Sequence, residues 1–426
     1  MALKLISLFA IFLIGCGDQR ISEVVINQSQ SSDEMPLNPI SMKSSKLIYK
    51  EENEERYYIP STPENILWGD LPSATTETIL TVPSGSEVVI DTISHEGVLR
   101  EQGRNPLKFF SSRGVNPDMI LEDVIALAES DISHDSPTEA PHIVTGPIGV
   151  ENAKLGDVLR VDILKIVPRV PYGVISNRHE QRSLSEEYSL GPERDGNSLL
   201  HNLEADRAAS AFVSIIKRGE GNNWLAIMES KNNTISFPIK PFMGVIGVAP
   251  TPSEVHSTIS GSHGGHLNIK ELVEGTSLYL PVFVDQAKFY TGDPKMAQGK
   301  RDVVLTGLRN SLRVTIRLTL LEKANPQIPS KSGFLNGPIA ETDKYWITIG
   351  FDDDFDMAMK KVVKESTNLL NEVMDVSREM AAVYLSVATD FEVSQVVNKV
   401  KRIYALIRKS DFKKEVDYGG GAANSN

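Results

Sequence analysis

The sequence predicts an α+β protein that is predominantly β, with a sandwich-like or barrel-like β body and a C-terminal α+β segment. Three observations support this fold class. Apolar residues recur with a period of two over much of 57–321, glycine and proline turns separate these runs, and the period changes to 3.6 after Asp353. With 426 residues and 40% hydrophobic content, the chain can bury a core of its own.

The N-terminus has the pattern of a secretory signal that ends in a lipid-attachment cysteine. The apolar run over 5–14 is too short to span a bilayer but has the length of a signal h-region. Leu13-Ile14-Gly15-Cys16 resembles the lipobox of bacterial lipoproteins. We therefore expect a signal peptide over 1–15, lipidation at Cys16 and a bacterial cell-envelope location, with Gly17 favouring the outer membrane. A secretory signal that happens to end near a cysteine is the alternative.

Composition also indicates which segments and partners to expect. Residues 16–45 are rich in Ser, Gln, Asn and Asp, so we expect a flexible tether, and 419–426 (GGGAANSN) should be a disordered tail. Cys16 is the only cysteine, which excludes an internal disulfide. A net charge of −12 argues against nucleic acid as a partner. Membrane contact is expected only through the lipid anchor.

The β-rich domain is expected over 57–321. The run 77–82 leads through Pro83-Ser84-Gly85 into 87–93, a strand, turn, strand signal. Further strands are predicted over 159–163, 211–216, 278–284 and 311–320. Gly85 and Gly156 precede apolar residues and an aspartate at the same offsets, which indicates either a repeated hairpin unit or a chance similarity.

The C-terminal α+β segment is expected over 340–413. Apolar residues between Phe355 and Val373 form one helical face, and Asp353 and Asp354 are suitable N-terminal caps. Ser377 can cap a second helix that runs through residue 387. A strand is then predicted over 391–397.

The segment 263–309 is the clearest candidate for a site. It places histidines, acids and amides in two glycine-rich loops around one apolar strand, and such loops on a rigid scaffold usually carry function. A plain structural β protein is therefore disfavoured. The same segment contains four cations, namely Lys295, Lys300, Arg301 and Arg309.

Several separated segments together resemble the acetamidase/formamidase family of amide hydrolases. They occur in the family's order between Tyr57 and Phe412, and include 59–65, 142–148, 171–173, 241–250, 263–265, 292–294, 346–350 and 390–397. The resemblance implies hydrolysis of the carbon–nitrogen bond of small linear amides such as formamide or acetamide, with release of ammonia. It also implies a divalent metal held by acidic and histidine side chains, because a metal polarises the poorly electrophilic amide carbonyl and activates water.

The resemblance carries roles onto particular residues. It implies Glu151 or Asp302 as general base, His142 in substrate positioning, and His263 and Asp293 as metal ligands. His266 completes a His-x-x-His pair with His263, for which zinc is the favoured ion.

Each of these residues also has a structural interpretation. His142 could be a loop histidine that caps backbone groups, and Glu151 and Asp157 could bond turn amides where strands start. Asp293 lies in Gly-Asp-Pro, a natural turn former. His263 and His266 could be surface histidines on a mobile loop.

The same segment departs from the family pattern where charge matters most. Asn268 replaces an acid of the family pattern, and Lys295 replaces a histidine. Lys300 and Arg301 replace an acid and a glycine, and Arg309 replaces a glutamate. Asp302 stands where the family has a glutamate, so the carboxylate is kept on a shorter side chain. Repulsion between a divalent ion and one ammonium about 5 Å away amounts to several kcal/mol at an effective dielectric constant near 20, which makes the metal doubtful.

Two functional hypotheses follow. The chain is either a membrane-tethered amidase with an altered site, or a catalytically impaired lipoprotein that acts as a ligand-binding or scaffold module. The substituted cations could receive an anionic small molecule, or they could form a solvated face. The partner is thus a small amide or a small anion, and a homo-oligomer is left open.

Overall fold

The structure is a computed structural model. It describes residue 40 and residues 47–51, 54–134, 140–178, 208–217, 224–230, 233–251, 255–300, 306–395 and 400–412. The expected signal peptide, Cys16, the tether apart from residue 40, Arg301, Asp302 and the tail over 419–426 lie outside the described residues.

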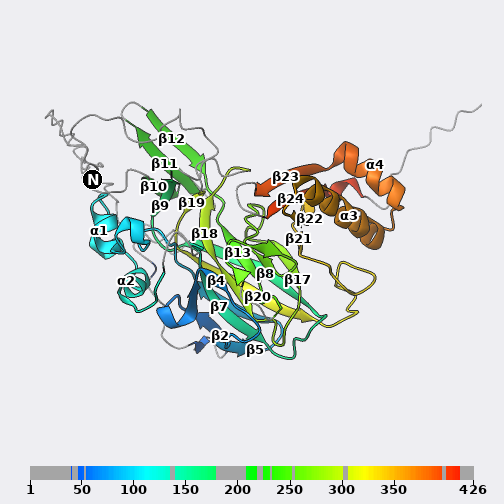
Figure 1. The fold of residues 1–426 in the computed structure, drawn as a ribbon, viewed down its shortest axis with the longest axis horizontal. Helices are drawn as coiled ribbons and strands as arrows, with labels where there is room; N and C mark the ends of the chain where they lie inside the picture. Colours follow the sequence, from blue (N-terminus) through cyan, green and yellow to red (C-terminus); the bar gives the residue numbers. More distant parts are fainter. Residues whose placement is uncertain are drawn as a thin grey trace, which may run out of the picture.

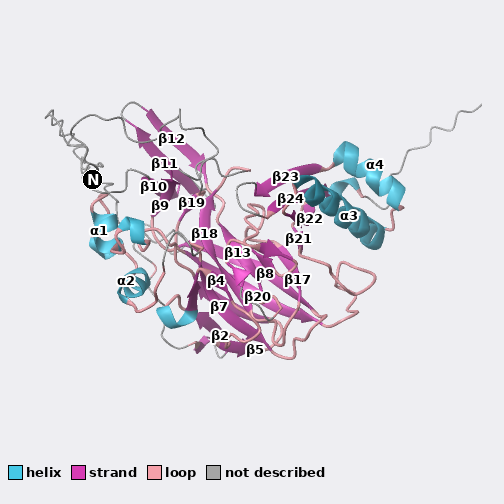
Figure 2. Ribbon diagram, viewed as in Figure 1, coloured by secondary structure: helices cyan, strands magenta, loops and turns pink. Residues whose placement is uncertain are grey.

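The fold is mostly strands with few helices, as predicted, and two large sheets form the body (Figure 2). The described strands of the first sheet follow the order β1 (Ile48–Glu51), β2 (Glu54–Ile59), β6 (Ser86–Asp91), β20 (Leu312–Leu321), β8 (Val158–Pro168), β17 (Ser277–Pro281), β21 (Ile339–Glu341), β22 (Tyr345–Asp352), β24 (Lys401–Arg408) and β23 (Asp390–Gln395). Neighbouring strands are antiparallel except for β2 and β6, which are parallel.

The second sheet carries the candidate site. Its main path is β12 (Asn233–Pro238), β11 (Trp224–Ser230), β10 (Ala208–Lys217), β9 (Tyr172–Arg178), β19 (Leu308–Arg309), β18 (Phe289–Ala297), β13 (Phe242–Val248), β16 (Gly264–Gly265) and β15 (Ser260–Gly261). The strand β7 (Ile143–Val150) pairs with β18, β3 (Ile66–Trp68) and β5 (Leu80–Val82). A separate pair joins β4 (Asp70–Leu71) to β14 (Val255–His256).

The main core lies between the two sheets. One cluster of buried residues combines Val88 and Val161 of the first sheet with Ile148, Ile246 and Phe289 of the second. Because the inner faces of both sheets bury the same cluster, the body has the sandwich-like architecture that the alternating pattern predicts.

The two glycine turns form a repeated crossing between the sheets and not a repeated hairpin. Gly85 (φ 89°) joins β5 to β6, and Gly156 (φ 96°) joins β7 to β8. In both cases the first strand belongs to the second sheet and the next strand to the first sheet. The hairpin interpretation is therefore wrong, because the strands that each turn joins do not pair with one another. The positive φ explains why glycine stands at both turns.

The two predicted C-terminal helices are confirmed as α3 (Phe355–Met374) and α4 (Arg378–Ala388). The side chain of Asp354 accepts a hydrogen bond from the Met357 amide, and Ser377 accepts one from the Met380 amide, as their cap positions predict. Both helices pack against the first sheet through a second apolar cluster. Phe355 and Val373, at the ends of the predicted apolar face, are exposed.

Two short helices lie at the opposite end of the molecule (Figure 1). These are α1 (Pro106–Ser111) and α2 (Glu122–Glu129), and their apolar side chains pack with Ile93 and Val174. Single 3-10 turns occur at Pro63–Asn65, Arg100–Gln102, Pro117–Met119 and Lys409–Asp411. Among the residues described, no helix has the length and apolar character needed to cross a membrane.

Candidate functional site

Three residues that are far apart in the sequence meet at one buried point. His142 directly precedes β7, His266 directly follows β16, and Asp293 lies in the middle of β18. Asp293 Oδ2 is 3.4 Å from His266 Nε2 and 3.9 Å from His142 Nε2. One potential ligand atom from each of the three residues lies within 4.8 Å of the others. We call these residues the triad.

Backbone geometry directs the Asp293 carboxylate to this point. Asp293 has a φ of 50°, a left-handed value that is unusual inside a strand but that aspartate tolerates better than most residues. The paired strand β13 places Gly244 opposite it, and a Cβ atom on Gly244 would overlap the carboxylate. The interpretation of Gly-Asp-Pro as a turn is therefore wrong, because the three residues continue β18.

Two of the four cations lie inside the site. Lys295 is 1% exposed, and its Nζ donates to Asn268 Oδ1 at 2.7 Å and to Gln298 Oε1 at 3.0 Å. Its Nζ is also 3.5 Å from Asp293 Oδ2, and Arg309 Nη1 forms an ion pair with Asp293 Oδ1. Both cations reach the carboxylate because Lys295 is two residues beyond Asp293 on one strand face and pairs with Arg309 across the sheet.

The solvated-face interpretation is therefore wrong for Lys295 and Arg309. It is right for Lys300, whose side chain is 67% exposed and pairs with Glu392 of β23.

The two triad histidines are uncharged near neutral pH. Burial lowers the pKa of His142 well below its usual range, and the neighbouring His266, Arg309 and Lys295 lower it further. Burial likewise lowers the pKa of His266, assisted by positive charges that include Arg402. The Nδ1 of His142 lies 3.2 Å from the Ser257 carbonyl oxygen, and donation there leaves Nε2 with a lone pair toward Asp293.

His263 is also buried, at 7% exposure, but it is not part of the triad. Burial lowers its pKa to about 4. The alternative of surface histidines on a mobile loop is therefore wrong for both His263 and His266, because neither reaches the surface.

The donor set of the triad fits a divalent ion. Two neutral imidazoles and one carboxylate are ligands that zinc takes in catalytic sites. Among the described residues, no hydrogen bond reaches Asp293 Oδ2 or His266 Nε2, although both atoms are buried. Buried polar atoms normally have partners, and an ion held by the triad would supply one to both atoms. The charge of Lys295 beside the same carboxylate oxygen is the feature that opposes it.

The structure does not bring the predicted base Glu151 to the triad. His142 and Glu151 flank the two ends of β7, and nine steps of ~3.3 Å along an extended strand separate them by roughly 30 Å. Glu151 is exposed in the following turn. Asp157 accepts hydrogen bonds from the Lys154 and Lys323 amides, which supports its turn interpretation.

A buried carboxylate that sequence reasoning missed lies on the other side of Arg309. Glu96 is 1% exposed, and its Oε1 is 3.9 Å from Arg309 Nε and 3.8 Å from His95 Nε2. Its Oε2 accepts hydrogen bonds from Gln102 Nε2 and Ser176 Oγ, both at 2.6 Å. The local signal was His95-Glu96-Gly97 in the loop that follows a predicted strand.

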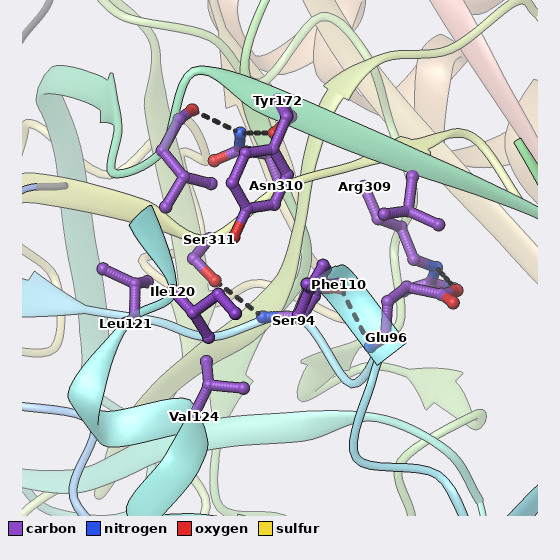
Figure 3. A pocket seen from close by; sticks show the side chains of 12 residues that line it. Ser94, Glu96, Phe110, Ile120, Leu121, Val124, Tyr172, Arg309, Asn310 and Ser311 are labelled. Atoms are coloured by element: carbon purple, nitrogen blue, oxygen red, sulfur yellow. Dashed lines mark hydrogen bonds and ion pairs between the residues drawn. The ribbon is translucent and has the colours of Figure 1, made fainter. Parts of the chain in front are cut away.

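A small pocket adjoins this side of the site. Figure 3 shows Glu96 and Arg309 together at one end, away from Leu121 and Val124. The apolar wall includes Ile120 and Leu121 just before helix α2, Val124 of α2, and β9, and the free space is about 20 Å³. A cavity of that size holds about one water-sized group.

Comparisons with known proteins agree with this fold. The sequence profile of the acetamidase/formamidase family matches residues 252–406. A Schizosaccharomyces pombe protein with the provisional name formamidase is 25% identical over 234 residues, which are 46% of this chain and 56% of that protein. The chain thus spans about half the length of this curated relative.

Two solved structures share the fold over most of both chains. The crystal structure of an acetamidase from Bacillus halodurans has a TM-score of 0.60 and 24% identity, and covers 83% of this chain and 98% of its own. A protein from Thermoanaerobacter tengcongensis, described as a predicted acetamidase/formamidase, has a TM-score of 0.60 and 24% identity, and covers 84% and 96%.

Proposed function

We propose that this chain is a member of the acetamidase/formamidase family, whose profile matches residues 252–406, and that it hydrolyses the carbon–nitrogen bond of small amides. The observation that carries the proposal is the buried convergence of His142, His266 and Asp293 within the fold that the family's solved structures share. A water molecule adds across the bond, so that one amide yields one carboxylic acid and one ammonia.

The triad would hold a divalent ion, which we take to be zinc because two of the three donors are imidazole nitrogens. When bound, such an ion polarises a carbonyl and lowers the pKa of an attacking water. The triad's own contribution is to keep both imidazoles neutral, and hence able to ligate, through burial.

The surrounding charged groups supply the remaining chemistry. Arg309 and Lys295 place fixed positive charge beside Asp293, where a developing carbonyl oxyanion would be stabilised. Glu96 is a buried carboxylate in the pocket lining, and its Oε1 accepts no hydrogen bond from a described residue. It is the group that we assign to accept a proton from the attacking water and pass it to the departing amine, in place of Glu151.

The pocket supports a small substrate. With about 20 Å³ of free space beside Glu96 and Arg309, it accommodates the hydrogen of formamide or the methyl of acetamide. Longer acyl chains would require the wall formed by Leu121 and Val124 to move.

The direct test is ammonia release by the purified chain from formamide and acetamide, with zinc, cobalt or manganese supplied. We expect activity that falls at least a thousandfold in Asp293→Asn and His142→Gln and is unchanged in Lys300→Met, whose exposed side chain lies outside the site. Absence of ammonia release with every ion would instead favour the non-catalytic binding lipoprotein.

We also propose that the protein is lipid-anchored in the bacterial cell envelope through Cys16. The pattern Leu13-Ile14-Gly15-Cys16 after an apolar run supports this. Cys16→Ala should move the protein from the membrane fraction to the soluble fraction and abolish incorporation of labelled palmitate. An unchanged membrane fraction would refute lipid anchoring at this residue.

A further inference from the structure

The ammonium of Lys295 lies next to the metal-ligand oxygen of the triad. We propose that Lys295 is a built-in cation that competes with a divalent ion for Asp293 and thereby sets the metal affinity of the site. This inference rests on the proposed metal-binding role of the triad.

The position of the ammonium is specified by several contacts. Its hydrogen bonds to Asn268 Oδ1 and Gln298 Oε1 hold Nζ 3.5 Å from Asp293 Oδ2, in a place that is 1% exposed. Both of these hydrogen-bond partners are uncharged amides, and the carboxylate beside them is that of Asp293. Lys295 is therefore a buried residue of the site, held in place by its hydrogen bonds, and not a surface lysine.

Positive side chains already occupy the site without an ion. Asp293 contacts both Lys295 and Arg309, and Arg309 in turn lies against Glu96. A divalent ion would add two uncompensated positive charges in a buried place, where charge is costly.

The distance between Lys295 Nζ and Asp293 Oδ2 explains why the ammonium and a divalent ion would compete for this carboxylate. A zinc or cobalt ion bonds a carboxylate oxygen at about 2.0–2.2 Å. Since Nζ is 3.5 Å from Asp293 Oδ2, an ion on that oxygen lies within about 6 Å of the ammonium in any direction. At that separation the two cations repel strongly, so the ion must displace the ammonium or bind weakly.

The test is a titration of the full chain with Co²⁺, followed by the visible d–d absorption of the bound ion. We expect Lys295→Met and Lys295→Gln, which remove the charge, to bind one Co²⁺ at least a hundredfold more tightly than the parent. Lys295→Arg, which keeps the charge, should stay within tenfold of the parent. Lys300→Met is the matched control, because it removes an exposed lysine five residues away, and its affinity should equal that of the parent.

Several outcomes would overturn the inference. These are equal affinities of the parent, Lys295→Met and Lys295→Gln, tight binding by Lys295→Arg, or absence of Co²⁺ binding in every variant. Circular dichroism checks folding, and the glutamine variant decides the matter if the methionine variant fails to fold.

Because the titration needs no turnover, it separates this inference from the proposed function. Tighter Co²⁺ binding by the neutral variants together with no ammonia release supports the competition and removes the hydrolase. Ammonia release together with equal Co²⁺ affinities supports the proposed hydrolase activity and refutes the competition between Lys295 and the ion.

Discussion

Replacing Asp293 with asparagine should strongly destabilise the protein, because this carboxylate compensates two buried cations. Its side chain is fully buried, forms an ion pair with Arg309 and lies 3.5 Å from the ammonium of Lys295. Asparagine keeps the size and shape of the side chain, so the substitution removes charge and leaves little cavity.

The magnitude follows from the distances. At an effective dielectric constant near 20, two unit charges 3.5 Å apart attract by roughly 5 kcal/mol, and Arg309 is closer still. The substitution also relieves the cost of burying the carboxylate, which offsets part of this attraction. Removing one partner of a buried ion pair typically costs about 3–5 kcal/mol, and we expect a loss of that size in the free energy of unfolding.

The assay is urea unfolding at pH 7.5, followed by circular dichroism and tryptophan fluorescence. Asp375→Asn is the control, since it breaks the exposed ion pair with Lys331 and should leave the free energy of unfolding unchanged. If Asp293→Asn is destabilised by less than about 1 kcal/mol, the carboxylate does not compensate the buried cations, and the reasoning fails.

Three further predictions concern pH, backbone space and substrate size. The pKa of His263 is lowered to about 4 in the folded protein against about 6.5 when unfolded, so its contribution to stability is present above pH 6.5 and is lost as pH falls toward 4. His263→Gln should flatten the pH dependence of urea unfolding by up to ~1.4 kcal/mol per pH unit, whereas His256→Gln, at an exposed position, should not. Gly244→Ala should reduce ammonia release at least a hundredfold, because the added methyl takes the place of the Asp293 carboxylate. Gly337→Ala should retain activity, because its methyl would meet only the Cα of Ser262 at an ordinary contact distance of 3.8 Å; equal rates for the two variants would contradict this. Val124→Ala should raise the rate ratio of propionamide to acetamide about tenfold by enlarging the pocket, and an unchanged ratio would show that the pocket does not receive the acyl group.

The elements that could be predicted from the sequence are those whose cause is local. The first residues of α3 and α4 follow from the N-terminal caps Asp354 and Ser377, whose side chains accept hydrogen bonds from amides three residues ahead. The alternation of β20 was visible because one face of that strand packs on the core. The pairing partners of the strands were not visible, and so a repeated hairpin was one of two interpretations of the turns at Gly85 and Gly156, which in fact cross between the sheets.

The candidate site could be predicted in part. His266 and Asp293 were predicted as metal ligands and His142 as a substrate-positioning residue, and the structure places these three together. The third predicted ligand, His263, is not part of this group, and Glu151 lies at the far end of β7. Glu96 was missed because its relation to Arg309 depends on contacts between residues more than 200 positions apart.

The sequence by itself determined the local periods, the caps, the chemical types available between residues 263 and 309, and the presence of cations among them. Only the tertiary structure decided which of those cations matter. Lys295 and Lys300 are five residues apart in the chain, yet one is buried against Asp293 and the other is exposed beside Glu392. The physical reason is that the effect of a charge depends on burial and on its distance from other charges, and the packing of β18 against distant strands sets both.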